Sequence, residues 1–109
     1  MRIVLARLDD MKAEDTVTID QTGKSPLCDY LVVTSGRSQR HVAAVAENVI
    51  KDLHAARVPH VRVEGLKQGD WVLIDAGDVI VHVFKPEVRA FYNLEKMWAA
   101  GKADEKRPR

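Results

Sequence analysis

The sequence predicts an α/β protein with a mixed sheet of about five strands flanked by helices. Three patterns support this fold class. Residues 71–84 contain two apolar runs around Asp-Ala-Gly-Asp, which is typical of a β-hairpin. Residues 38–57 carry a long apolar stripe at helical spacing. Strand-like segments precede and follow this helix, so we expect it to be a right-handed crossover between two parallel strands.

The first half of the chain contains a helix, two strands and the start of the long helix. Residues 2–13 are helix-compatible because apolar side chains recur at helical spacing. Residues 16–20 alternate in polarity, as in a half-exposed strand. Residues 29–35 form a nearly continuous apolar run that ends at Gly36, which predicts a central strand. Ser38 is the expected N-cap of the long helix.

The second half contains the remaining strands and a C-terminal helix. Residues 60–64 alternate in polarity and predict a third strand, and residues 65–70 predict a polar turn before the hairpin. Pro86 suits the first turn of a final helix. We expect one face of the sheet to be covered by the long helix, with the terminal helices at its edges. The apolar stripe of the final helix comprises Val88, Phe91, Leu94 and Trp98.

The hairpin is predicted to have two different faces. If Ala76 and Gly77 form the loop, Asp75 lies opposite Asp78, and the pairs Trp71–His82 and Leu73–Ile80 follow. A three-residue loop with a bulge at Gly77 is the alternative, and it would shift this pairing. One face is uniformly aliphatic and suits a covering helix: Val72, Ile74, Val79, Val81 and Val83. The other face is mixed: Trp71, Leu73, Asp75, Asp78, Ile80, His82 and Phe84.

Length and composition indicate one domain. The chain has 109 residues, of which 46% are hydrophobic, and we expect residues 1–100 to form the domain and residues 101–109 a flexible charged tail. The formal net charge of +1 gives no global reason to expect nucleic-acid or membrane binding. No apolar run approaches the ~20 residues of a membrane span, and residues 1–14 lack a signal-peptide pattern. The single cysteine, Cys28, is expected to be a buried thiol, and the location cytoplasmic.

Catalysis has little support in the sequence. The glycine signal Gly36-Arg37-Ser38 lies between a strand and a helix, where amides can hold a phosphate, but neither phosphate-loop pattern is present. Arg62 and Glu64, two apart on a strand, do not supply the paired carboxylates of a two-metal site. We therefore predict no catalytic residue, metal or cofactor. The alternative is a nucleotidyltransferase-like enzyme that binds nucleotide at the glycine segment.

The four histidines do not form a metal site in any arrangement that the sequence predicts. Two of them are too far apart on the long helix, and the others lie on different strands, so hydrogen-bonded or solvent-facing roles are expected. The residues are His41, His54, His60 and His82.

A docking role has more support. Trp71, Leu73 and Ile80 would form a sizeable apolar patch if uncovered, and such patches mark interfaces. Asp75 and Asp78 at its rim would suit a basic partner. The alternative is that the C-terminal helix folds over this face.

Several long blocks, in the same order, closely resemble the ribosomal silencing factor family, RsfS, also called Iojap. The resemblance covers roughly residues 4–99. The blocks are Asp29-Tyr30 leading to Gly36, Val63 to Leu66, Trp71 to Asp75, Gly77 to Phe84, and Arg89 to Trp98.

The resemblance implies a nucleotidyltransferase-like fold without the catalytic carboxylates, and a role without catalysis. The family binds the large ribosomal subunit through its ribosomal protein number fourteen, blocks joining of the small subunit and represses translation. Carried over by motif, and with Ile80 added from the mixed face, the expected partner-binding residues are Trp71, Leu73, Asp75, Asp78, Ile80, His82 and Tyr92.

Two further contacts are expected. Family members often self-associate, so a homodimer is an alternative use of the exposed sheet face. A minor contact with ribosomal RNA would use Arg37, Arg40 and four basic residues of the tail. These are Lys102, Lys106, Arg107 and Arg109.

Overall fold

The computed structural model describes residues 1–24 and 28–88 of the chain. The helices and strands follow the predicted order. They are α1 (Arg2–Asp10), β1 (Glu14–Asp20), β2 (Tyr30–Ser35), α2 (Gln39–Ala55), β3 (Arg62–Glu64), β4 (Trp71–Asp75) and β5 (Val79–Phe84). A helical turn begins at Pro86. The rest of the predicted C-terminal helix, including Tyr92, and the predicted tail lie outside the described residues.

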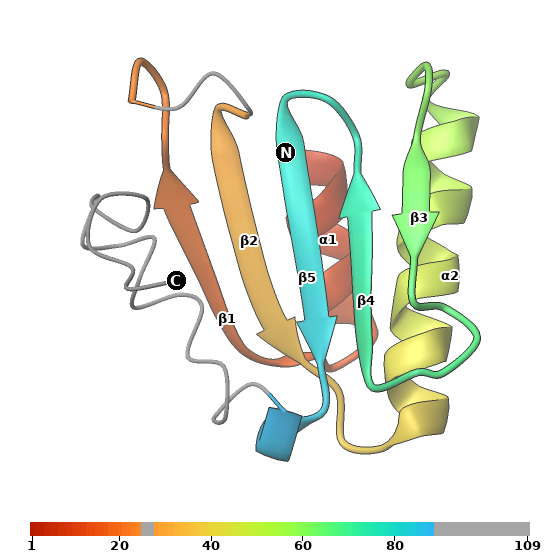
Figure 1. The fold of residues 1–109 in the computed structure, drawn as a ribbon. Helices are drawn as coiled ribbons and strands as arrows, with labels where there is room; N and C mark the ends of the chain where they lie inside the picture. Colours follow the sequence, from red (N-terminus) through yellow and green to blue (C-terminus); the bar gives the residue numbers. More distant parts are fainter. Residues whose placement is uncertain (25–27, 89–109) are drawn as a thin grey trace.

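The strands form one five-stranded mixed sheet in the order β1-β2-β5-β4-β3 (Figure 1). Only β2 and β5 are a parallel pair among these neighbours, and the other three pairs are antiparallel. The pairings make β3 run parallel to β2, as the crossover predicts. However, β5 and β4 lie between them, so the hairpin fills the gap that α2 spans.

Both described helices cover the same face of the sheet, as Figure 1 shows. The prediction that α1 lies at an edge is wrong, because it packs beside α2. The guanidinium of Arg7 in α1 makes two hydrogen bonds to the Asp52 carboxylate in α2, at 2.7 and 3.1 Å. The core between helices and sheet contains the predicted aliphatic face of the hairpin together with Val4, Leu8, Val32, Val42, Val45, Ala46, Val49 and Leu53.

The hairpin register differs from the predicted one. Trp71 lies opposite Phe84, and Leu73 lies opposite His82. The amide of Ala76 donates to the carbonyl oxygen of Val79 at 2.9 Å, so the chain reverses at Gly77 and Asp78. Gly77 has φ +89°, a conformation that a glycine adopts without a Cβ penalty. The shift is by two positions, so every strand residue keeps its predicted face, and only Asp78 leaves the mixed face for the loop.

The third strand is shorter than predicted. It begins at Arg62, because Arg57 and His60 adopt positive φ values of 62° and 56° in the connection from α2. His60 therefore lies in a turn and not in a strand. Among the described residues, no helix combines the length and the apolar character that crossing a membrane requires.

Candidate functional site

The face of the sheet opposite the helices carries an apolar and aromatic cluster, and we call this face the second face. Three of its side chains are fully buried: Leu31 and Val33 from β2, and Phe84 from β5. Half-buried apolar side chains surround them on β1, β4, β5 and the turn after β5, namely Ile19, Trp71, Ile80 and Val88. The predicted mixed face of the hairpin is therefore part of a larger apolar cluster.

Three aromatic side chains of the second face form a cluster toward the end of the sheet where β4 begins and β5 ends. The ring centroids of Trp71 and Phe84 lie 4.9 Å apart, and the rings of His82 and Phe84 are stacked at 5.9 Å. The indole Nε1 of Trp71 donates a hydrogen bond to Nδ1 of His82 at 3.0 Å. Trp71 as a whole is half-buried.

His82 is held as a neutral imidazole. Burial lowers the pKa of His82 from its usual 6.5 to about 4, because the imidazolium would lose its hydration. An indole N–H can only donate, so Nδ1 must be the acceptor and the ring proton lies on Nε2. His82 is only 6% exposed, which makes it an internal part of the predicted partner-binding set.

Three other predicted site residues, Leu73, Ile80 and Asp75, lie on β4 and β5. Leu73 lies opposite His82, and Ile80 lies opposite Asp75, so all four share the second face. Asp75 supports the hairpin itself, because its Oδ1 accepts from the amide of Gly77 at 2.9 Å. The half-buried Asp75 also pairs with the exposed Arg62 of β3 at 3.5 Å.

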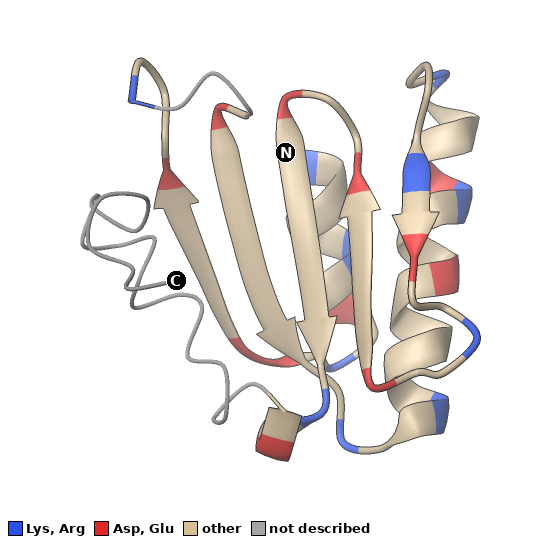
Figure 2. Cartoon of the chain, in the orientation of Figure 1, with Lys and Arg blue, Asp and Glu red and all other residues tan. Residues whose placement is uncertain are grey.

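One end of the sheet is acidic, and Figure 2 shows the red of acidic residues at the ends of several strands there. Strands β1 and β4 end there with Asp20 and Asp75. Strands β2 and β5 begin at the same end, directly after Asp29 and Asp78. Asp20, Asp29 and Asp78 are exposed. Asp20 and Asp29 were missing from the predicted rim, because only the parallel pairing of β2 with β5 brings them beside the hairpin. The signal available in the sequence was the aspartate that ends or directly precedes each of these four strands.

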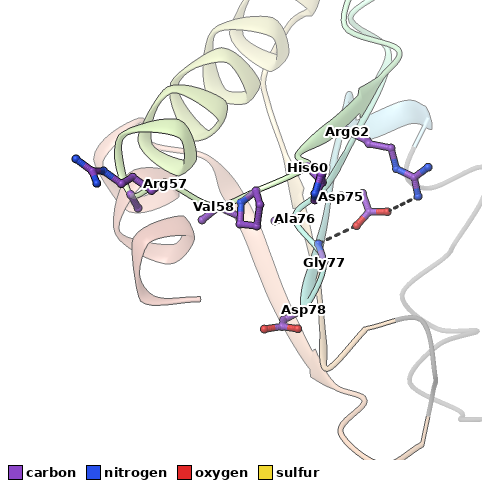
Figure 3. A pocket seen from close by; sticks show the side chains of 10 residues that line it. Arg57, Val58, His60, Arg62, Asp75, Ala76, Gly77 and Asp78 are labelled. Carbon is purple, nitrogen blue, oxygen red and sulfur yellow. Dashed lines mark hydrogen bonds and ion pairs between the residues drawn. The ribbon is translucent and has the colours of Figure 1, made fainter.

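An open groove of about 960 Å³ adjoins this acidic end of the sheet. It is lined by the end of α2, the turn before β3 and the hairpin tip, and Figure 3 shows Arg62 directed at Asp75 within it. Its charged lining residues have both signs, with Arg57 and Arg62 against Asp75 and Asp78. This balance gives the groove no preference for an anionic or a cationic ligand.

Three amides near the start of α2 are engaged within the chain. The amide of Gly36 donates to the carbonyl oxygen of Phe84 at 2.9 Å, and that of Arg37 donates to Nδ1 of His41 at 2.9 Å. Ser38 caps the helix as predicted, since its Oγ accepts from the amide of His41 at 3.1 Å. These bonds compete with any phosphate at this point. The nucleotide-binding alternative, which places a phosphate at this segment, would have to displace these bonds or use other amides.

Two other site predictions can be compared with the described residues. Cys28 is buried as expected, and burial raises the pKa of its thiol. Within residues 1–24 and 28–88, no group of three or more histidine, cysteine, aspartate or glutamate side chains is arranged to hold a metal ion.

The fold and the second face together define a class: an α/β protein with a five-stranded mixed sheet whose face opposite α1 and α2 carries an aromatic cluster and has an acidic end. The family model described as "Ribosomal silencing factor during starvation", RsfS, matches residues 1–109. The chain belongs to this family, which is a family of regulatory proteins.

Individual relatives agree with this assignment. A ribosomal silencing factor RsfS of Zymomonas mobilis is 48% identical over 101 residues, which cover 93% of this chain and 76% of the relative. A crystal structure of a protein from Chromobacterium violaceum matches with a TM-score of 0.85 and 39% identity, over 89% of this chain and 81% of the other. A mouse protein named "Mitochondrial assembly of ribosomal large subunit protein 1" is 31% identical, over 94% of this chain and 46% of the relative.

Proposed function

We propose that this chain binds the large ribosomal subunit through its ribosomal protein number fourteen, blocks joining of the small subunit and so represses translation. The observation that carries the proposal is the match of the whole chain to the ribosomal silencing factor family. The name of the mouse relative mentions the large ribosomal subunit, which supports this subunit as the partner.

The second face supplies a suitable docking surface for this role. Its half-buried aromatic and aliphatic side chains, Trp71, Leu73 and Ile80, offer apolar area that a partner can cover. Tryptophan is enriched among the residues that dominate binding energy. The acidic end, with Asp75 and Asp78, would attract a basic ribosomal protein. Asp78 would act from the hairpin loop and not from the sheet face. Tyr92, which lies outside the described residues, is a further partner-binding residue in this proposal.

Binding to purified large subunits tests the proposal. We expect Trp71→Ala to weaken co-sedimentation with large subunits by more than about fivefold, or ~1 kcal/mol, because the indole provides the main apolar contact. Addition of the wild-type protein should also slow the joining of small subunits to large subunits, as light scattering would report.

The matched control is Ile3→Ala. Ile3 is an exposed large apolar side chain on α1, which lies on the opposite side of the sheet. Its loss should leave subunit binding unchanged. Circular dichroism of both variants would show whether the fold is retained. A wild-type protein that does not co-sediment with large subunits, or a folded Trp71→Ala variant that binds as well as wild type, would contradict the proposal.

A further inference from the structure

We propose that His82 is a positioning residue that fixes the indole of Trp71, so that Trp71 meets its partner through its ring carbons and the partner surface that receives it is apolar. This inference rests on the proposed docking function. It adds the chemistry of the central contact and a residue that acts without touching the partner.

The first step is the geometry of the pair. His82 and Trp71 lie on neighbouring strands and on the same face, displaced along the strands, because Trp71 pairs with Phe84 and Leu73 pairs with His82. The imidazole and indole centroids are 5.9 Å apart, and the Nε1–Nδ1 distance is 3.0 Å. The contact therefore combines a hydrogen bond with ring packing on Phe84.

The second step is accessibility. His82 is 6% exposed and lies between the cross-strand neighbours Val33 and Leu73. A partner that covers the second face can reach the half-buried Trp71 but little of the imidazole. We therefore expect an effect of His82 on binding to act through the side chains that it contacts, of which Trp71 is the one held by a hydrogen bond.

The third step is the hydrogen-bond capacity of the indole. Its N–H is the only polar group of the Trp71 side chain, and it is directed at His82 within the chain. The rest of the indole consists of carbon atoms, so any contact that a partner makes with it is apolar. A rigid aromatic side chain also binds with a smaller loss of conformational freedom than a mobile one. Both points favour an apolar partner surface at this position.

The fourth step is the charge state of His82. The cross-strand neighbours of the imidazole, Val33 and Leu73, do not titrate. The charged side chains of this face lie farther along it, with Glu64 opposite Leu73 and Asp75 opposite Ile80. The acceptor Nδ1 is therefore available at neutral pH. Protonation would place a hydrogen on it and break the bond to Trp71.

A double-mutant cycle on large-subunit binding tests the inference. His82→Leu removes the acceptor and should weaken binding roughly three- to tenfold, the range expected when one anchor side chain loses its fixed orientation. In a Trp71→Phe background, which has no N–H to position, His82→Leu should cause no further loss. His82→Asn places an oxygen near the position of Nδ1 and should restore most of the binding.

Nuclear magnetic resonance of the indole N–H provides a readout that does not depend on the ribosome. The chain has two tryptophans, and the Trp71→Phe variant identifies which indole resonance belongs to Trp71. Exchange of the Trp71 indole proton with solvent should be at least about tenfold slower in wild type and His82→Asn than in His82→Leu. If His82→Leu does not fold, His82→Phe removes the acceptor with a different packing and takes its place.

The two readouts separate failure of this inference from failure of the proposed function. A wild-type protein with a protected indole proton that does not bind large subunits would refute the docking function and the inference that rests on it. The inference alone is overturned if subunits bind and His82→Leu weakens binding equally in both backgrounds. It is also overturned if His82→Leu leaves binding or indole exchange unchanged.

Discussion

At the scale of single residues, His82 makes folding depend on pH. Its pKa falls from 6.5 to about 4 in the folded chain through burial, so the unfolded chain binds more protons between these values. We predict that the free energy of unfolding is insensitive to this residue above pH ~6.5 and decreases as the pH falls toward 4. The full loss is about 3 kcal/mol. Urea unfolding at several pH values measures it.

The His82→Leu variant is the control for this pH dependence. It has no titrating group at the site, so the decrease between pH ~6.5 and ~4.5 should largely disappear. Below that range, carboxylates with lowered pKa, such as Asp20 beside the amide of Thr22, add their own loss in both proteins. Equal slopes for wild type and variant between pH 6.5 and 4.5 would contradict the prediction.

Two glycines with positive φ allow a matched test of steric constraint. Gly65 has φ +83°, and an added Cβ would overlap the carbonyl oxygen of Trp71. Gly77 has φ +89°, but an added Cβ would meet nothing within 4 Å. We predict that Gly77→Ala costs about 1 kcal/mol of unfolding free energy, from backbone strain alone. Gly65→Ala should cost more than about 2 kcal/mol, because the start of β4 must also move. Urea unfolding of both variants would measure the difference. Equal losses would contradict the prediction, because they would show that overlap with the carbonyl oxygen of Trp71 adds nothing to the backbone strain.

The same scale shows how far the sequence could predict the site. Alternation assigned Trp71, Leu73, Asp75, Ile80 and His82 to one face, because a strand turns each side chain by half a turn and a shift of two positions changes no facing. The burial of His82 was not predictable in this way. The imidazole lies beside Val33 of β2, which is distant in sequence.

At the scale of elements, the start of α2 depends on Ser38. Its Oγ accepts from the amide of His41 at 3.1 Å, which satisfies a donor that the helix cannot pair. We predict that Ser38→Ala lowers the free energy of unfolding by about 1 kcal/mol. Ser38→Asp keeps an acceptor at the cap and should stay within a few tenths of wild type. Urea unfolding would distinguish the two variants, and a comparable loss for Ser38→Asp would mean that the cap is not the cause.

The elements themselves were largely predictable, and their pairing was less so. The α2 stripe, the N-cap and the hairpin are local patterns, and each is present in the structure. The hairpin register depends on which residues reverse the chain. Both Ala76-Gly77 and Gly77-Asp78 suit a turn by composition, and the amide of Ala76 bonding to Val79 selects the second. The positive φ values of Arg57 and His60, which shorten β3, have no comparable local signal.

At the scale of the whole molecule, the parallel pairing of β2 with β5 organises the surface. A crossover helix indicates that two strands run in the same direction, but it does not say how many strands separate them. Here two strands are inserted, so β2 pairs with the last described strand of the chain. This insertion places Asp29 beside Asp78, because β2 pairs directly with β5 at the acidic end of the sheet.

The acidic end leads to the last prediction, which rests on the proposed docking function. The formal net charge is only +1, so any attraction to a basic ribosomal protein must come from a local group of charges. We predict that Asp78→Lys weakens binding to isolated ribosomal protein number fourteen at low salt. It should also flatten the decrease in affinity between about 0.05 and about 0.5 M salt, over which the screening length shortens severalfold.

The control has the same change in net charge on another part of the surface. Glu47 is exposed on α2, on the helix-covered side of the sheet, so Glu47→Lys adds the same two positive charges away from the acidic end. Because exposed charges act mainly within a screening length of about 10 Å at 0.1 M salt, the salt dependence of Glu47→Lys should follow wild type. If both variants flatten the salt dependence equally, net charge and not the acidic end of the sheet determines how the affinity depends on salt. If neither changes it, the partner does not approach this end of the sheet.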